Sequence, residues 1–196
     1  MTKGRLEAFT DGVLAIIITI MVLELKVPHG GYFDDLKSLL PIFLSYVLSF
    51  IYLAIYWNNH HHMMQTVKHV TGTILWANMH LLFWLSLVPF VTGWMGENHF
   101  TKASVFLYGI ILLGAAIAYV ILQNLIIKSH GEDSILKKAL NKDVKGKISP
   151  VLYLLGILSS FFNVWISGVL YIVVAIIWLI PDTRIEKALK SQKEYK

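Results

Sequence analysis

The sequence predicts an all-α membrane protein whose helices cross the bilayer six times. Hydrophobic residues make up 56% of its 196 residues and charged residues only 15%, against about 25% charged residues in an average soluble domain. The apolar residues gather into long runs, and a run of about 20 is what a hydrocarbon core of ~30 Å requires of a helix. The basic residues gather outside these runs. We therefore expect one polytopic domain over residues 1–196, surrounded by a lipid bilayer.

The first predicted helix covers residues 5–27 and carries Asp11 inside its apolar run. An ionisable residue there costs roughly 2.5–3.5 kcal/mol on insertion scales, so it marks a candidate functional position. At about 100° per residue, six residues share one mostly aliphatic face, and Asp11 lies about a third of a turn from its centre. They are Phe9, Gly12, Ile16, Thr19, Ile20 and Leu23. This face could pack against a neighbouring helix, or symmetry copies of it could surround an axis.

The next apolar runs predict helices over residues 38–62, 71–95 and 101–128. Gly109 and Gly114 in the last of these runs permit close helix packing. A polar connector follows, and we expect it to carry a short surface helix from Ser134 to Leu140. No cleavage site of small residues follows the first run, which favours a retained helix over a signal peptide.

The last apolar block, residues 149–180, is too long for one crossing. A single helix would measure ~48 Å at 1.5 Å per residue, so a break near Asn163 is expected, giving helices over 147–163 and 165–181 and a tail over 182–196. Six crossings then place all but Lys26, Lys37 and Lys102 of the 17 lysine and arginine residues on one side. The positive-inside rule makes that side cytoplasmic. We expect a plasma-membrane protein with both termini in the cytoplasm.

The sequence argues against several classes of protein and site. It has no TVGYG filter loop and too few arginines for a voltage sensor. Cysteine is absent, which excludes disulfides and thiolate metal sites. Neither a G-x-S-x-G turn nor an HExxH helix occurs, so we expect no enzyme and no cofactor. The basic residues follow membrane topology, which argues against a nucleic-acid partner.

Histidines supply the remaining candidate positions. His60, His61 and His62 are consecutive, so on a helix they point in different directions and cannot converge on one metal ion. We expect an interface cluster beside Trp57 with one histidine turned inward, and the sequence leaves open whether the cluster senses pH. Trp76 and His80 are four residues apart and share a helix face, whereas Asn78 points elsewhere. We expect His80 to be a structural hydrogen-bonding residue.

The expected partner of His80 is Arg5, Thr10 or Asp11 on the first helix. An alternative is that Asp11 and His80 bind or relay a proton in a small proton-coupled transporter. A third alternative is a structural membrane scaffold that carries no flux.

The first helix also carries a recognisable motif. Arg5, Phe9, Thr10 and Asp11 form Arg-x-x-x-Phe-Thr-Asp, and an apolar stretch that ends in LELKVP follows. The motif resembles that of the transmembrane protein 175 family of potassium channels, Arg-x-x-x-Phe-Ser-Asp, with threonine in place of serine. Further similarity lies at Tyr56, Trp57 and the histidines after them, and at Trp76 and His80. The helix count resembles that of the short prokaryotic form with one six-helix repeat.

The resemblance implies a homotetramer in which four first helices line a central pore that favours potassium. Ile16 would form the narrowest aliphatic ring, Ile20 and Leu23 further rings, and Thr19 a hydroxyl layer. Potassium would occupy this pore transiently, with no fixed metal site. The resemblance also implies a structural network of Arg5, Phe9, Thr10, Asp11, Trp76 and His80. The four pore residues are among those that the helical periodicity places on one face.

Overall fold

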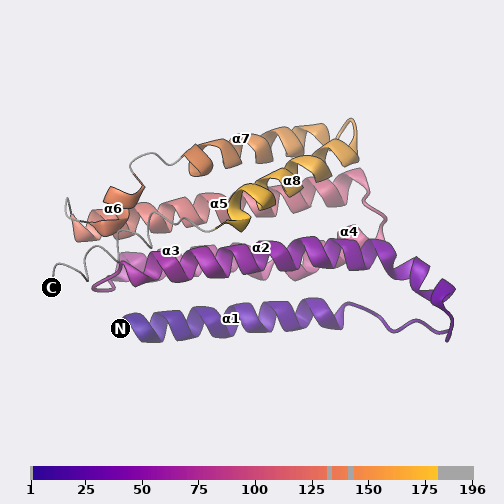
Figure 1. The fold of residues 1–196 in the computed structure, drawn as a ribbon, viewed down its shortest axis with the longest axis horizontal. Coiled ribbons are helices and arrows are strands. Elements are labelled where there is room, and N and C mark those ends of the chain that lie inside the picture. The colour runs from indigo at the N-terminus through magenta and orange to yellow at the C-terminus, as the bar shows by residue number, and fades with distance from the viewer. Residues whose placement is uncertain (1, 132–133, 141–143, 181–196) are drawn as a thin grey trace.

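The computed structural model describes residues 2–131, 134–140 and 144–180, and these form a bundle of helices (Figure 1). The helices are α1 (Lys3–Leu23), the 3-10 helix η1 (Phe33–Leu39), α2 (Leu40–Gln65), α3 (Gly72–Ser86), α4 (Val88–Glu97), α5 (Lys102–His130), α6 (Ile135–Ala139), α7 (Val144–Ser159) and α8 (Val164–Leu179). The expected tail over 182–196 lies outside the described residues.

Four of the described segments are long and apolar enough to cross a membrane. They are α1, η1 together with α2, α3 together with α4, and α5. Helices α7 and α8 have 16 residues each, or ~24 Å at 1.5 Å per residue, which is shorter than a hydrocarbon core of ~30 Å. A count of six crossings therefore stays a prediction.

Proline and asparagine set several of the helix boundaries. Helix α1 ends at Leu23, and Pro28 further on prevents the helix from resuming at Val27, because the residue that precedes a proline disfavours helical backbone. The third apolar run divides at Leu87, and Pro89 lies in the first turn of α4. Asn163 is the N-cap of α8, and its side chain accepts a hydrogen bond of 2.9 Å from the Trp165 backbone N–H. Such an N-cap satisfies one of the free donors at the helix start.

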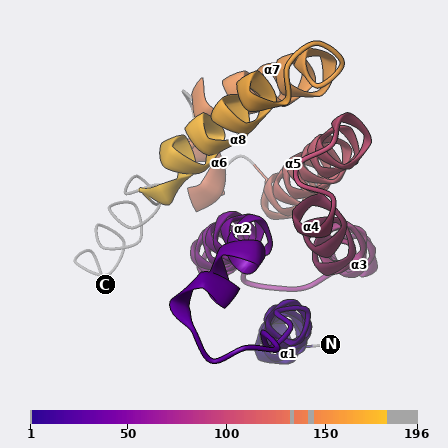
Figure 2. The same cartoon turned by 90° about the vertical axis from the view of Figure 1, so that its right-hand side faces the viewer.

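Helix α1 lies at one edge of the bundle, on the side away from α7 and α8 (Figure 2). It packs against α2, α3 and α4, while α5 packs against α3, α4, α7 and α8. A Cβ at Gly114 of α5 would lie 2.4 Å from the Trp84 ring of α3, so this glycine lets the two helices approach closely. Among the described residues, α1 has neighbours on one face only.

Candidate functional site

The face of α1 that the subunit leaves uncovered is the face that the helical periodicity grouped. Ile16 is 61%, Ile20 42% and Leu23 75% exposed, and Thr19 and Gly12 are also exposed. The opposite face is buried and consists of Leu6, Thr10, Leu14, Ile17 and Met21. Within the subunit, α1 therefore packs through one stripe and presents a second, aliphatic stripe outward.

Thr19 supplies the hydroxyl of this outward stripe. Its Oγ1 donates a hydrogen bond of 2.8 Å to the carbonyl of Ala15, one turn earlier in α1. A hydroxyl group has one proton and two acceptor lone pairs. Because the hydroxyl proton is donated to the Ala15 carbonyl, the Thr19 oxygen can only accept a hydrogen bond from a group outside the helix or coordinate a cation there.

Asp11 is bound to α2. The indole Nε1–H of Trp57 donates to Asp11 Oδ1 at 2.9 Å, and the Trp57 ring stacks on His61 with 6.2 Å between ring centroids. A hydrogen bond to a carboxylate is stronger than one between neutral groups. This contact therefore fixes the N-terminal half of α1 against α2.

Thr10 is bound through a buried chain of hydrogen bonds that joins α1, α3 and α2. Asn78 Nδ2 donates to Thr10 Oγ1 at 2.9 Å, and Asn78 Oδ1 lies 2.8 Å from His60 Nε2. All three side chains are almost completely buried. Since the amide oxygen only accepts, His60 Nε2 carries a proton in this contact. The prediction that one residue of the histidine run turns inward is confirmed, and that residue is His60.

The expected contact of Trp76 and His80 with the first helix is not seen within the subunit that the structure describes. His80 Nε2 accepts a hydrogen bond of 3.0 Å from Trp84 Nε1–H on its own helix, and Trp76 is 78% exposed. Both residues instead border a shallow hollow between α3 and α5. Their spacing placed them correctly on one face, but that face is directed away from α1.

Asn78 is the member of this hydrogen-bond network that the sequence did not single out. The signal was present, because Ile74, Asn78, Leu81 and Leu85 follow one another at spacings of four, three and four, and all are buried. A polar residue on such an apolar stripe requires a partner inside the bundle. The two other residues of the motif, Arg5 and Phe9, are exposed on α1.

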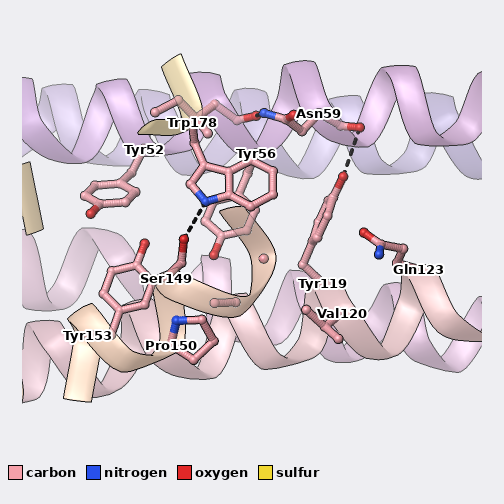
Figure 3. Close-up of a pocket in the computed structure, with 13 residues that line it drawn as sticks. Tyr52, Tyr56, Asn59, Tyr119, Val120, Gln123, Ser149, Pro150, Tyr153 and Trp178 are labelled. Carbon is pink, nitrogen blue, oxygen red and sulfur yellow. Dashed lines mark hydrogen bonds between the residues drawn. The ribbon is translucent and has the colours of Figure 1, made fainter. Parts of the chain in front are cut away.

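A second candidate site is the partly enclosed cavity between α2, α5, α7 and α8 (Figure 3). It measures about 40 Å³ and is lined by uncharged residues, among them Tyr52, Tyr56, Tyr119 and Tyr153. Tyr119 donates to the Asn59 carbonyl at 3.2 Å, and Trp178 Nε1–H donates to Ser149 Oγ at 2.7 Å. No residue of α1 lines the cavity, so it is separate from the α1 stripe.

Within the described residues, no group of three or more His, Cys, Asp or Glu side chains could hold a metal ion. The geometry therefore directs attention to the outward stripe of α1 and to the contacts that hold α1 in place.

Known proteins of similar sequence and structure are ion channels. A family model described as "Endosomal/lysosomal potassium channel TMEM175" matches residues 5–89. "Potassium channel HX13_20290" of Chryseobacterium sp. (strain P1-3) is 62% identical over 191 residues, which cover 97% of this chain and 100% of that protein. The crystal structure of a lysosomal potassium-selective channel TMEM175 homolog from Chamaesiphon minutus is 33% identical. It aligns with a TM-score of 0.76 over 90% of this chain and 95% of that one. "Endosomal/lysosomal proton channel TMEM175" of Gallus gallus is 30% identical over 101 residues, which cover 45% of this chain and 20% of that protein.

Proposed function

The chain belongs to the TMEM175 family of ion channels and is a multi-pass membrane protein, and from that premise we propose that it is a potassium-favouring cation channel whose pore is lined by α1. The observation that carries the proposal is the outward aliphatic stripe of α1. Helix α1 lies at the edge of its subunit, with one face packed against the other helices and the other face exposed. Copies of such a helix from several subunits can surround a central axis.

We propose that four copies assemble around this axis. Most oligomers close by rotational symmetry, and a homotetramer surrounds one pore with four copies of the stripe. The stripe also contains Gly12 and Thr19, a small and a polar residue, and small residues permit helices to approach closely in a membrane. Each subunit would cross the plasma membrane six times, with both termini in the cytoplasm.

The pore would be narrow and mostly dry at its aliphatic rings. Ile16, Ile20 and Leu23 lie about 6 and 4.5 Å apart along the helix axis at 1.5 Å per residue. Aliphatic rings offer no ligands, so a cation must pass partly hydrated or lose water at a cost. Potassium gives up water more cheaply than sodium, which favours potassium modestly. The narrowest ring, Ile16, would also act as a gate, since hydrophobic constrictions close by dewetting.

Thr19 supports the cation preference of this arrangement. Its proton is engaged by Ala15, so only its oxygen faces outward. Four such oxygens between the rings of Ile16 and Leu23 would replace water around a cation and would offer nothing to an anion. Asp11 and Thr10 would have a structural role, because their contacts anchor α1 and lie off the stripe. Arg5 and Phe9, the other two residues of the motif, would share this role.

The proposal is tested by the flux of potassium and of sodium into proteoliposomes for the wild type and for Ile16→Asn. The wild type is expected to favour potassium, with a reversal potential that follows the potassium gradient. Ile16→Asn is expected to conduct more and to select less, because a polar ring does not dewet. Ile176→Asn on α8 is the matched control, since Ile176 is also 61% exposed, and its flux should equal that of the wild type.

Two results would contradict the proposal. A wild type without cation current, or an assembled Ile16→Asn channel with wild-type conductance and selectivity, would remove the α1 stripe from the ion path. A reversal potential that follows the proton gradient instead would support proton transport, and a flux that saturates and requires that gradient would support the transporter alternative.

A further inference from the structure

Two histidines far from the α1 stripe join the loop between α2 and α3 to the end of α5. His69 lies in this loop, and His130 is the last residue of α5. Their rings stack with 4.6 Å between centroids and 23° between planes. The backbone N–H of Lys68, next to His69, donates to His130 Nε2 at 2.9 Å. The loop and the end of α5 lie at the same end of the bundle (Figure 1).

These hydrogen bonds determine the protonation state of His130. A backbone N–H can only donate, so the Nε2 atom that accepts from Lys68 carries no proton. The other ring nitrogen, Nδ1, lies 2.9 Å from the Ile126 carbonyl and 2.8 Å from Ser129 Oγ. Since a carbonyl only accepts, Nδ1 carries the proton. The contact between loop and helix therefore requires a neutral imidazole in one tautomer.

The charges near this contact are mostly positive. In the adjoining elements the titratable and charged residues of the described chain are His61 and His62 near the end of α2, Lys68 and His69 in the loop, Lys128 on α5, Lys137 and Lys138 on α6, and Lys145 and Lys147 on α7. Glu132 and Asp133 follow in the sequence and lie outside the described residues. The free carbonyls at the end of α5 favour a cation, whereas the Lys68 N–H and the neighbouring ammonium groups oppose one.

We propose that His69 and His130 form a proton-sensitive latch, in which protonation of His130 removes the acceptor of the Lys68 N–H and releases the α2–α3 loop from α5. A proton on Nε2 would face the Lys68 N–H, and two donors repel each other. Histidine is the side chain whose ordinary titration falls between about pH 5 and 8. The released loop connects α2 and α3, which carry the Trp57 and Asn78 contacts to α1.

Amide hydrogen exchange at Lys68 in the reconstituted full chain tests the latch, with protection corrected for the intrinsic effect of pH on exchange. In the wild type, protection is expected to fall by about tenfold from about pH 8 to about pH 5, the change expected when one hydrogen bond is lost. His130→Gln keeps an acceptor that does not titrate, so its protection should stay constant with pH. His130→Ala should show low protection throughout. The Leu75 amide, which bonds to the Thr71 carbonyl, is the internal control.

The ¹⁵N chemical shifts of the His130 ring give a second measurement that needs no variant. At high pH they should place the proton on Nδ1. A proton on Nε2 at high pH, wild-type Lys68 protection that does not change with pH, or an equal pH dependence in His130→Gln would overturn the latch.

Discussion

The buried hydrogen bonds of Asn78 should make Asn78→Leu a destabilising substitution. The change preserves side-chain size but removes the donor to Thr10 and the acceptor of His60. Side-chain hydrogen bonds between membrane helices contribute about 0.6 kcal/mol on average and up to about 1.7. Two such bonds give a loss of about 1 to 3 kcal/mol. Since 1 kcal/mol shifts the melting temperature of a domain of this size by about 2–4 °C, we expect a decrease of about 2–12 °C.

The assay is thermal unfolding of the purified channel, followed by the loss of its folded peak in size-exclusion chromatography. Asn124→Leu on α5 is the matched control, because Asn124 is exposed, and surface substitutions usually stay within about 0.5 kcal/mol. Thr10→Val should lower the melting temperature by less than Asn78→Leu, since it removes one bond of the two. Equal melting temperatures for Asn78→Leu and Asn124→Leu would refute the reasoning that this network stabilises the subunit.

Two further predictions concern helix packing and the ion pair that follows α1. A Cβ at Gly96 would lie 2.6 Å from the Ile42 Cα, whereas one at Gly168 would meet nothing within 4 Å. Gly96→Ala should therefore cost about 1–3 kcal/mol through overpacking, and Gly168→Ala should leave the melting temperature unchanged or raise it. Lys26 Nζ lies 2.6 Å from Glu97 Oε1 in an exposed pair, and this hydrogen bond, followed by the charge of Glu97, raises the pKa of Lys26. The contribution of the pair is complete below the unfolded pKa of lysine, ~10.4, and is lost only as the pH rises through the raised pKa. The difference in melting temperature between Glu97→Gln and the wild type should thus be small and constant from about pH 6 to 9. A difference that changes within that range would contradict the ion pair between Lys26 and Glu97 as its source.

Helical periodicity was sufficient to group the residues of the outward α1 stripe, because Ile16, Ile20 and Leu23 recur at the spacing of a helix face. It could not say whether that face is covered by the subunit. The packing of α1 through Leu6, Thr10, Leu14, Ile17 and Met21 decides this. The same holds for His60, because three consecutive histidines differ only in direction, and only the position of α3 selects the one that turns inward.

By itself, the sequence determined the helical class, the apolar segments and the motif that carries the family resemblance, since these depend on local composition and spacing. Only the tertiary structure decided the partners of polar side chains. Trp76 and His80 share a face as predicted, but the rotation of α3 about its axis directs that face away from α1 and turns Asn78 toward it. That rotation depends on how α3 packs against α1 and α5 together, and no spacing within a single helix contains this information.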